Sequence, residues 1–307
     1  MKVNLSVKIG KLKLNNPVMV ASGTFGYAEE FKDFINLKKL GAIVTKTITL
    51  SPRRGNPPAR TCETPSGMLN SIGLENPGLE AFLKDKLPFL EKLGIPIIMS
   101  IASEEDPREF IELVKRLNRY KAVSGLELNI SCPNVMGQES LISQDCQATY
   151  SIVKSIRRIT AKTLITKLSP NVTRISDIAK AAQEAGSDCV ALINTLSGMS
   201  INAEKQSPRL AAVVGGVSGP AIRPVALKMV WEAYNKINIP IIGMGGIIDT
   251  SSALEFFIAG ASAISIGTAN FINPRVSVEI ISGLGGYLKR KKIKDIRSLT
   301  GSLIYES

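Results

Sequence analysis

The sequence predicts an α/β fold, a single (β/α)₈ TIM barrel domain over residues 1–307 with extended βα loops over its carboxyl-terminal face. Short apolar, β-branched runs recur eight times along the chain, and an amphipathic stretch of helical period follows each run. A length of 307 residues suits eight strand–helix units, and no Gly/Ser-rich linker divides the chain. A doubly wound open sheet is the alternative, but no Gly-x-Gly-x-x-Gly fingerprint follows the first predicted strand.

Each predicted strand is a run of Val, Ile, Leu or Ala that stops at Gly, Pro or a polar residue, which are residues that end strands. In chain order the strands lie at Val18–Ala21, Ala42–Lys46, Ile97–Ile101, Gly125–Ile130, Leu164–Leu168, Cys189–Asn194, Ile239–Met244 and Ala263–Gly267. Apolar residues spaced three or four apart predict helices at Glu29–Leu40, Gly78–Leu93, Pro107–Tyr120, Gln147–Thr160, Ile175–Ala185, Ile222–Asn235, Thr250–Ala259 and Pro274–Lys291. The longest stretches with neither period, predicted as irregular loops, are Ser51–Glu75 and Leu196–Gly219.

The composition, 44% hydrophobic and 21% charged, is that of a soluble globular protein. The chain has no histidine, and its four cysteines show no Cys-x-x-Cys spacing, so we expect no metal site and a reducing, cytoplasmic location. Met1–Leu14 lacks the apolar core of a signal peptide, and no run approaches the roughly 20 apolar residues of a membrane helix. We therefore expect no membrane association.

The formal charge is +12, from 38 basic and 26 acidic residues. Its densest basic run, Lys289–Lys294, follows the last predicted helix and contains no aromatic residue that could stack on bases. We interpret this run as a solvated helix end and expect no nucleic acid partner.

Polar residues follow most of the predicted strands directly, and in a barrel the carboxyl ends of all strands meet at one mouth. Lys46 and Lys167 end two otherwise apolar strands. Because a buried unpaired ammonium is costly, each lysine should face an anion or a hydrogen-bond acceptor.

Glycines follow the seventh and eighth predicted strands, where barrels often bind phosphate through exposed backbone N–H groups. A phosphate there and a lysine near the barrel axis together predict a flavin mononucleotide (FMN). The residues at these two strand ends are Gly245, Gly246, Gly267 and Thr268.

The fourth predicted strand runs into Ser131-Cys132-Pro133-Asn134, which places a thiol at the mouth of the barrel. In a chain without histidine, the thiol of Cys132 is a candidate base or nucleophile, and nearby lysines would lower its pKa. Cys189 lies within an apolar strand and is interpreted as an inert core residue.

Several segments resemble the class 1 dihydroorotate dehydrogenases over nearly the whole chain. The most specific are Asn70–Gly78, Asn129–Asn134, Lys167–Asn171 and Asn194–Met199. Gly215–Pro224 resembles the NAD-linked type B branch, and a cysteine at the position of the base separates the chain from the quinone-linked class.

The resemblance implies an enzyme with one FMN per chain that oxidises (S)-dihydroorotate to orotate in de novo pyrimidine (UMP) biosynthesis, with Cys132 as the base. It implies a substrate site formed by Lys46, Asn70, Ser71, Ile72, Gly73, Leu74, Asn129, Asn194 and Thr195. It implies an FMN site formed by Ser22, Lys46, Thr47, Asn129, Lys167, Ile193, Gly219, Gly245, Gly246, Gly267 and Thr268.

The same resemblance implies that electrons pass to NAD⁺ through a partner subunit that carries FAD and a [2Fe–2S] cluster, in a heterotetramer of two catalytic and two electron-transfer chains. Three alternatives remain open: a fumarate-linked homodimer, a flavin enzyme acting on another dihydropyrimidine such as dihydrouracil, and a flavin- or phosphate-binding barrel without turnover.

The chain departs from this family at two places. Ser100 stands where the family usually has an asparagine that touches the flavin, and serine keeps a hydroxyl on a shorter side chain. The segment Val135–Ile142 lacks the glycine-rich character of NAD-linked relatives, in which it closes over the substrate.

Overall fold

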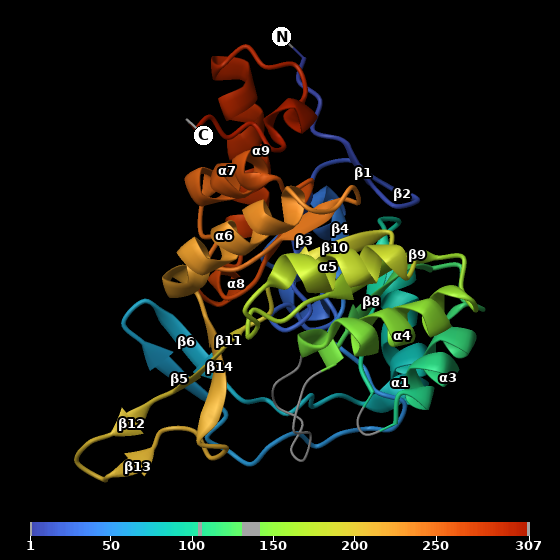
Figure 1. Ribbon diagram of the computed structural model, residues 1–307, viewed down its shortest axis with the longest axis vertical. Coiled ribbons are helices and arrows are strands. Elements are labelled where there is room, and N and C mark those ends of the chain that lie inside the picture. Colours follow the sequence, from blue (N-terminus) through green and yellow to red (C-terminus); the bar gives the residue numbers. More distant parts are fainter. Residues whose placement is uncertain (1, 104–105, 131–141, 306–307) are drawn as a thin grey trace.

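The computed structural model describes residues 2–103, 106–130 and 142–305 and contains a closed barrel of parallel strands (Figure 1). Around the barrel the strands follow the order β10-β15-β16-β3-β4-β7-β8-β9, which confirms the predicted (β/α)₈ architecture. Their bounds are β3 Val18–Val20, β4 Ala42–Val44, β7 Ile97–Ile101, β8 Val123–Asn129, β9 Thr163–Lys167, β10 Cys189–Leu192, β15 Ile241–Gly243 and β16 Ala263–Ile266.

The strand register decides which side chains enter the barrel. Asn129 of β8 lies opposite Lys167 of β9, and successive side chains along a strand point to opposite faces. Asn129 and Lys167 therefore share the inner face at the carboxyl ends of two adjacent strands, while Leu128 of β8 faces the surrounding helices.

Helices surround the barrel, and successive helices lie side by side on its outer surface (Figure 1). The longer ones are α3 Arg108–Leu117, α4 Cys146–Arg157, α5 Ile175–Glu184, α6 Arg223–Tyr234, α7 Thr250–Ala259 and α9 Val276–Arg290, and α8 is the single turn Ala269–Ile272. Two of them begin at aspartate N-caps: Asp145 accepts from the Ala148 N–H and Asp249 from the Ser252 N–H. Six of the predicted helices thus appear within a few residues of their expected bounds.

The predicted helix at Glu29–Leu40 is wrong. The structure has two short 3₁₀ turns there, η1 at Glu29–Phe31 and η2 at Leu37–Lys39. The side chain of Asn36 accepts a hydrogen bond from the backbone N–H of Lys38, and such a local bond offers the backbone an alternative to a helix. The segment is held instead by packing, since the rings of Phe25 and Phe31 stack with centroids 3.9 Å apart.

The predicted helix at Gly78–Leu93 is interrupted. It consists of α1 (Gly78–Ala81), a π-helical turn η3 (Phe82–Lys86) and α2 (Leu87–Glu91). Pro88 lies in the first turn of α2, and a proline has no N–H to donate and clashes with the carbonyl four residues earlier. The wider π turn just before it relieves that conflict.

The two stretches predicted as irregular loops contain strands as well as irregular segments. They pair with each other in a four-stranded antiparallel sheet of order β11-β14-β6-β5, which extends from the mouth of the barrel (Figure 1). Its strands are β5 Thr61–Thr64, β6 Gly67–Asn70, β11 Leu196–Met199 and β14 Val214–Ser218, and a small hairpin is formed by β12 Ile201–Asn202 and β13 Ser207–Pro208. The pairing of β6 with β14 therefore brings residues of the first stretch next to residues of the second.

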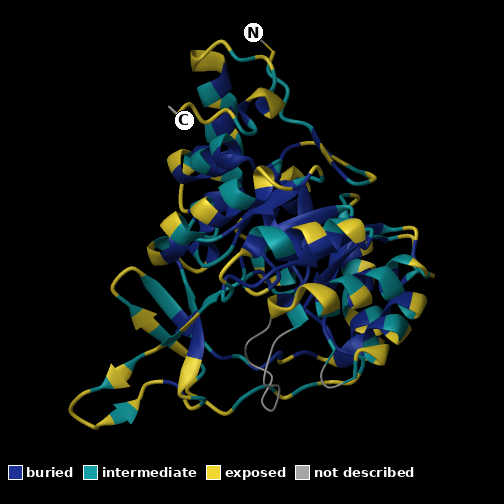
Figure 2. Ribbon diagram, viewed as in Figure 1, coloured by how far each residue is buried: buried dark blue, intermediate teal, exposed yellow. Residues whose placement is uncertain are grey.

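The opposite end of the barrel is covered by a hairpin of β1 (Val7–Ile9) and β2 (Leu12–Leu14). Its turn packs on the amino end of β9, where the Lys11 N–H donates to the Thr163 hydroxyl at 3.0 Å. Buried residues concentrate in the barrel strands, and exposed ones lie on the outer helix faces and the β12–β13 hairpin (Figure 2). Within the described ranges, no helix is both long enough and apolar enough to cross a membrane.

Candidate functional site

A cavity lies at the carboxyl ends of the barrel strands, partly covered by the antiparallel sheet. Residues at or just after β3, β4, β8, β9, β10, β15 and β16 line it, and β6 and β14 of the antiparallel sheet add to the wall. The cavity brings together many residues expected from the sequence to bind substrate or cofactor: Ser22, Lys46, Thr47, Asn70, Ile72, Gly73, Leu74, Asn129, Lys167, Ile193, Asn194, Thr195, Gly219, Gly245, Gly246, Gly267 and Thr268.

Two expected site residues are not among those that line the cavity. Ser71 is fully buried, and its backbone N–H donates to the Arg60 carbonyl at 2.8 Å. Cys132 lies outside the described residues, so its role as the base stays a prediction. Cys189 of β10 is buried, and burial raises the pKa of its thiol well above the ordinary value, so it stays protonated and inert.

The cavity is electropositive. Lys46 and Lys167 line it, and no carboxylate belongs to the described part of its lining. Lys167 is only 6% exposed, and its ammonium donates to the Ser22 hydroxyl at 3.2 Å. A neutral hydroxyl does not balance a buried positive charge, so this wall favours a ligand that carries negative charge or strong acceptor atoms.

Amide side chains form a connected hydrogen-bond network on another wall. The Asn129 amide donates to the Thr47 hydroxyl at 3.2 Å, and its oxygen accepts from the Asn194 amide at 3.4 Å. The oxygen of Asn194 in turn accepts from the backbone N–H of Thr195 at 2.8 Å. Each amide carries two donor hydrogens and two acceptor lone pairs, which is the chemistry that suits a polar ring.

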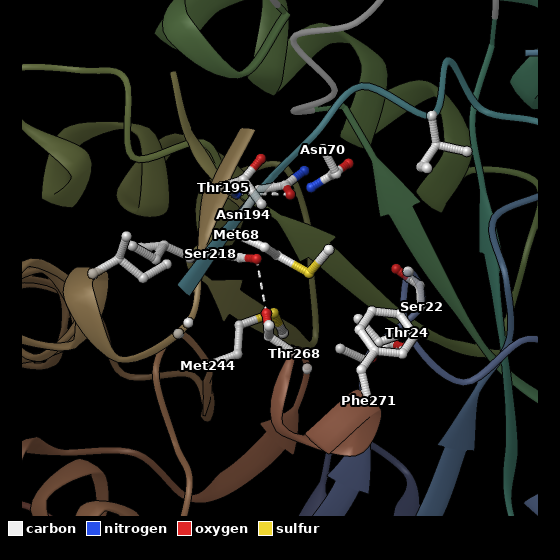
Figure 3. Close-up of a pocket in the computed structure, with 18 of the residues that line it drawn as sticks. Ser22, Thr24, Met68, Asn70, Asn194, Thr195, Ser218, Met244, Thr268 and Phe271 are labelled. Atoms are coloured by element: carbon white, nitrogen blue, oxygen red, sulfur yellow. Dashed lines mark hydrogen bonds between the residues drawn. The ribbon is translucent and has the colours of Figure 1, made fainter. Parts of the chain in front are cut away.

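A glycine-lined cradle follows β15 and β16. Gly246 has a φ of +76°, and a Cβ there would lie 2.7 Å from Cβ of Arg223 and 2.9 Å from the carbonyl oxygen of Gly219. Beside it, the Thr268 hydroxyl donates to the Ser218 hydroxyl at 2.8 Å (Figure 3). Bare backbone and hydroxyl groups in such a turn suit a phosphate group.

The loop that carries Asn70 to Leu74 is held by a guanidinium. Arg60 donates to the carbonyls of Asn56 and Arg54 and to the carboxylate of Glu75. Asn70 itself, at the end of β6, donates to the Gly216 carbonyl of β14 at 3.3 Å. The antiparallel sheet therefore positions this loop over the cavity.

Sequence reasoning placed Thr24 and Met244 at the mouth but assigned them no binding role, and it missed the lining residues Met68, Ser218, Ile248 and Phe271. Met68 and Ser218 belong to the antiparallel sheet and, in Figure 3, lie on the same side of the cavity as Asn70 and Thr195. The period of two would have placed Met68 on the face of Asn70, but only if β6 had been predicted as a strand.

Taken together, the lining can hold an elongated ligand that has an anionic end at the glycine cradle and a polar ring at the amide network. Among the described residues, no group of three or more His, Cys, Asp or Glu side chains lies close enough together to hold a metal ion.

Comparison with known proteins identifies relatives over nearly the full length. The family model described as dihydroorotate dehydrogenase matches residues 4–288. Curated relatives named dihydroorotate dehydrogenase B (NAD(+)), catalytic subunit, include one from Geotalea uraniireducens, 48% identical over 303 residues, and one from Trichlorobacter lovleyi, 50% identical over 303 residues, each with 99% of both chains covered. A third, from Thermoanaerobacter pseudethanolicus, is 48% identical over 301 residues and covers 98% of this chain and 99% of its own.

Proposed function

The chain belongs to the dihydroorotate dehydrogenase family, and we propose that it is the catalytic subunit of the NAD-linked type B enzyme. In this role it oxidises (S)-dihydroorotate to orotate in the de novo synthesis of pyrimidine nucleotides. The observation that carries the proposal is the cavity, in which the amide network, two lysines and the glycine cradle line one volume. Relatives that share 48% and 50% of its residues over 99% of their length bear the same enzyme name.

FMN fits the lining of this cavity and would be its cofactor. The cradle at Gly246 has no room for a Cβ and leaves backbone groups beside the Thr268 hydroxyl for a phosphate. Lys167, nearly buried and bonded to Ser22, would face the ring system, where an ammonium favours negative charge. When bound, FMN supplies the hydride acceptor for the reaction.

The substrate would lie between the amide network and the loop of Asn70 to Leu74. The amide groups of Asn129 and Asn194, which line the cavity, offer both donors and acceptors to the fixed pattern of a pyrimidine ring. Asn70 and Lys46, both at the cavity wall, supply donors for the carboxylate of dihydroorotate. These contacts orient the substrate carbons C5 and C6 and exclude water from them.

Cys132 would act as the base. It lies three positions after Asn129, the last residue of β8, in the sequence. Its thiolate would remove the proton from C5 of dihydroorotate while hydride leaves C6. The proton is then held on Sγ, and a C5–C6 double bond forms in orotate. Alanine at this position would remove the acceptor of that proton.

The words "catalytic subunit" in the names of the relatives denote an assembly with another subunit. We propose that this partner carries FAD and a [2Fe–2S] cluster and passes electrons to NAD⁺, in a heterotetramer of two catalytic and two electron-transfer chains. A cytoplasmic location agrees with four cysteines that show no Cys-x-x-Cys spacing in 307 residues.

Anaerobic reduction tests this function. The purified chain should be yellow and release FMN on denaturation, and dihydroorotate should bleach the flavin absorbance. Cys132→Ala should retain FMN but slow the bleaching by orders of magnitude, with Cys146→Ala, a surface thiol, as the matched control.

A colourless protein that cannot be reconstituted with FMN contradicts the proposal. Bleaching by dihydrouracil but not by dihydroorotate would assign another substrate. Efficient reduction of fumarate or NAD⁺ by the single chain would contradict the proposed electron-transfer subunit.

A further inference from the structure

Ser100 is buried directly behind the cavity wall. Its side chain is 0% exposed and is absent from the cavity lining, but its Oγ lies 2.8 Å from Oγ1 of Thr47, which does line the cavity. The backbone N–H of Ser100 donates to the hydroxyl of Thr45 at 3.4 Å, so the residue is fixed at both its backbone and its side chain. Within the described residues, the side chain of Ser100 is therefore linked to the cavity lining through Thr47.

The direction of the hydrogen bonds along this wall follows from one unambiguous donor. The backbone N–H of Thr195 can only donate, so the atom of Asn194 that receives it is the amide oxygen. The nitrogen of Asn194 then donates to the oxygen of Asn129.

It follows that the nitrogen of Asn129 is the atom that faces Thr47, and that Oγ1 of Thr47 accepts this bond. Each amide orientation is set by the one before it along the wall.

The remaining question is which hydroxyl donates in the pair of Ser100 and Thr47. Among the described residues, Thr47 is the hydrogen-bond partner of the Ser100 hydroxyl. If Thr47 donated, the hydrogen of a fully buried hydroxyl would be left without an acceptor in this part of the structure, which costs more than an unused lone pair. Ser100 is therefore the donor.

With both Ser100 and Asn129 donating to it, Oγ1 of Thr47 has used both of its lone pairs, and its own hydrogen is left for the cavity. We propose that Ser100 is a positioning residue that makes the Thr47 hydroxyl a hydrogen-bond donor to an acceptor atom of the flavin ring. This inference rests on the proposed function, in which Thr47 belongs to the FMN site.

The test compares Ser100→Ala in two backgrounds. In the wild-type background, the holoenzyme variant loses the donor that orients Thr47, and its FMN dissociation constant should rise about five- to tenfold, with a shifted flavin absorption band. In a Thr47→Val background, where no hydroxyl remains to be oriented, Ser100→Ala should change FMN affinity less than about twofold. Ser100→Cys, nearly the same size with a weak donor, should give an intermediate value.

Orotate titration of the same holoenzymes separates the two ligands, since its dissociation constant should change less than about twofold if Thr47 serves the flavin. Equal losses of FMN affinity in both backgrounds, or no loss in either, would overturn the inference. So would a loss confined to orotate. If Ser100→Ala does not fold, Ser100→Cys takes its place in both backgrounds. A wild-type chain that binds no FMN would overturn both this inference and the proposed function.

Discussion

Replacing Gly246 by alanine should damage the glycine cradle through two physical effects. The residue has a φ of +76°, a left-handed conformation that costs a non-glycine residue about 1–2 kcal/mol. The new Cβ would also lie 2.7 Å from Cβ of Arg223 and 2.9 Å from the oxygen of Gly219. Neither is the end of a flexible side chain, so the backbone must shift, at about 1–3 kcal/mol.

The sum, roughly 2–5 kcal/mol, is large beside a total stability of about 5–15 kcal/mol. A loss of 3 kcal/mol should lower Tm by roughly 4–6 °C, measured by calorimetry on the holoenzyme. Fluorescence of released FMN should show weaker cofactor retention in the same samples.

Gly267→Ala is the matched control. Gly267 lines the same cavity and has no positive φ, and a Cβ at this position would lie 3.9 Å from the nearest side chain, that of Ala21. Its Tm should stay within about 2 °C of the wild type. If Gly246→Ala also leaves Tm unchanged, the strain argument for the cradle is refuted.

Two further predictions concern the substrate loop and a helix cap. Arg60→Ala removes the hydrogen bonds to Asn56, Arg54 and Glu75, so orotate should bind about tenfold more weakly while the FMN content is kept. Arg54→Ala is the control, because this variant retains the backbone carbonyl that accepts from Arg60. Equal effects of the two variants would refute the role of the Arg60 guanidinium in holding the loop. Hydrogen bonds from the Ser252 hydroxyl and backbone hold the pKa of Asp249 below its usual value, so the charged carboxylate stabilises the fold above about pH 4, and that contribution is lost as the pH falls through the lowered pKa. Asp249→Asn should therefore lower the free energy of unfolding in urea by about 0.5 kcal/mol at pH 7. The difference between the two proteins should shrink as the pH falls below about 4, and a difference that stays constant in acid would contradict this role of the charge.

The barrel could be predicted because each of its strands carries a local signal. Apolar, β-branched runs such as Ile97–Ile101 coincide with the observed strand β7, and Thr250–Ala259 coincides with α7. The helical periodicity gave wrong predictions where a nearby side chain or a proline disfavours a regular helix. The side chain of Asn36 bonds to the backbone within the predicted helix at Glu29–Leu40 and competes with it, and Pro88 follows a π turn within the predicted helix at Gly78–Leu93.

The antiparallel sheet could not be read from either of its segments alone. Strand β6 pairs with β14 through contacts such as Leu69 with Val217, and the strands are short and rich in glycine or polar residues. Without a regular hydrophobic period, each segment resembles a loop until its partner is known. Met68 and Ser218 were missed as lining residues for this reason.

The order of strands and the polar residues that end them follow from the sequence, since both depend on neighbours within a few positions. That is why Lys46, Asn129, Lys167 and the glycine turns could be assigned to one mouth of a barrel, while the role of Cys132 stays a prediction.

The tertiary structure alone decided the direction of the hydrogen bonds along the cavity wall. Ser100 meets Thr47 across 53 positions of the chain, and Asn129 meets Thr47 across 82. Which hydroxyl donates depends on where every neighbouring donor and acceptor lies in space. Residues so far apart are brought together only by closure of the barrel, so no local pattern records their contact.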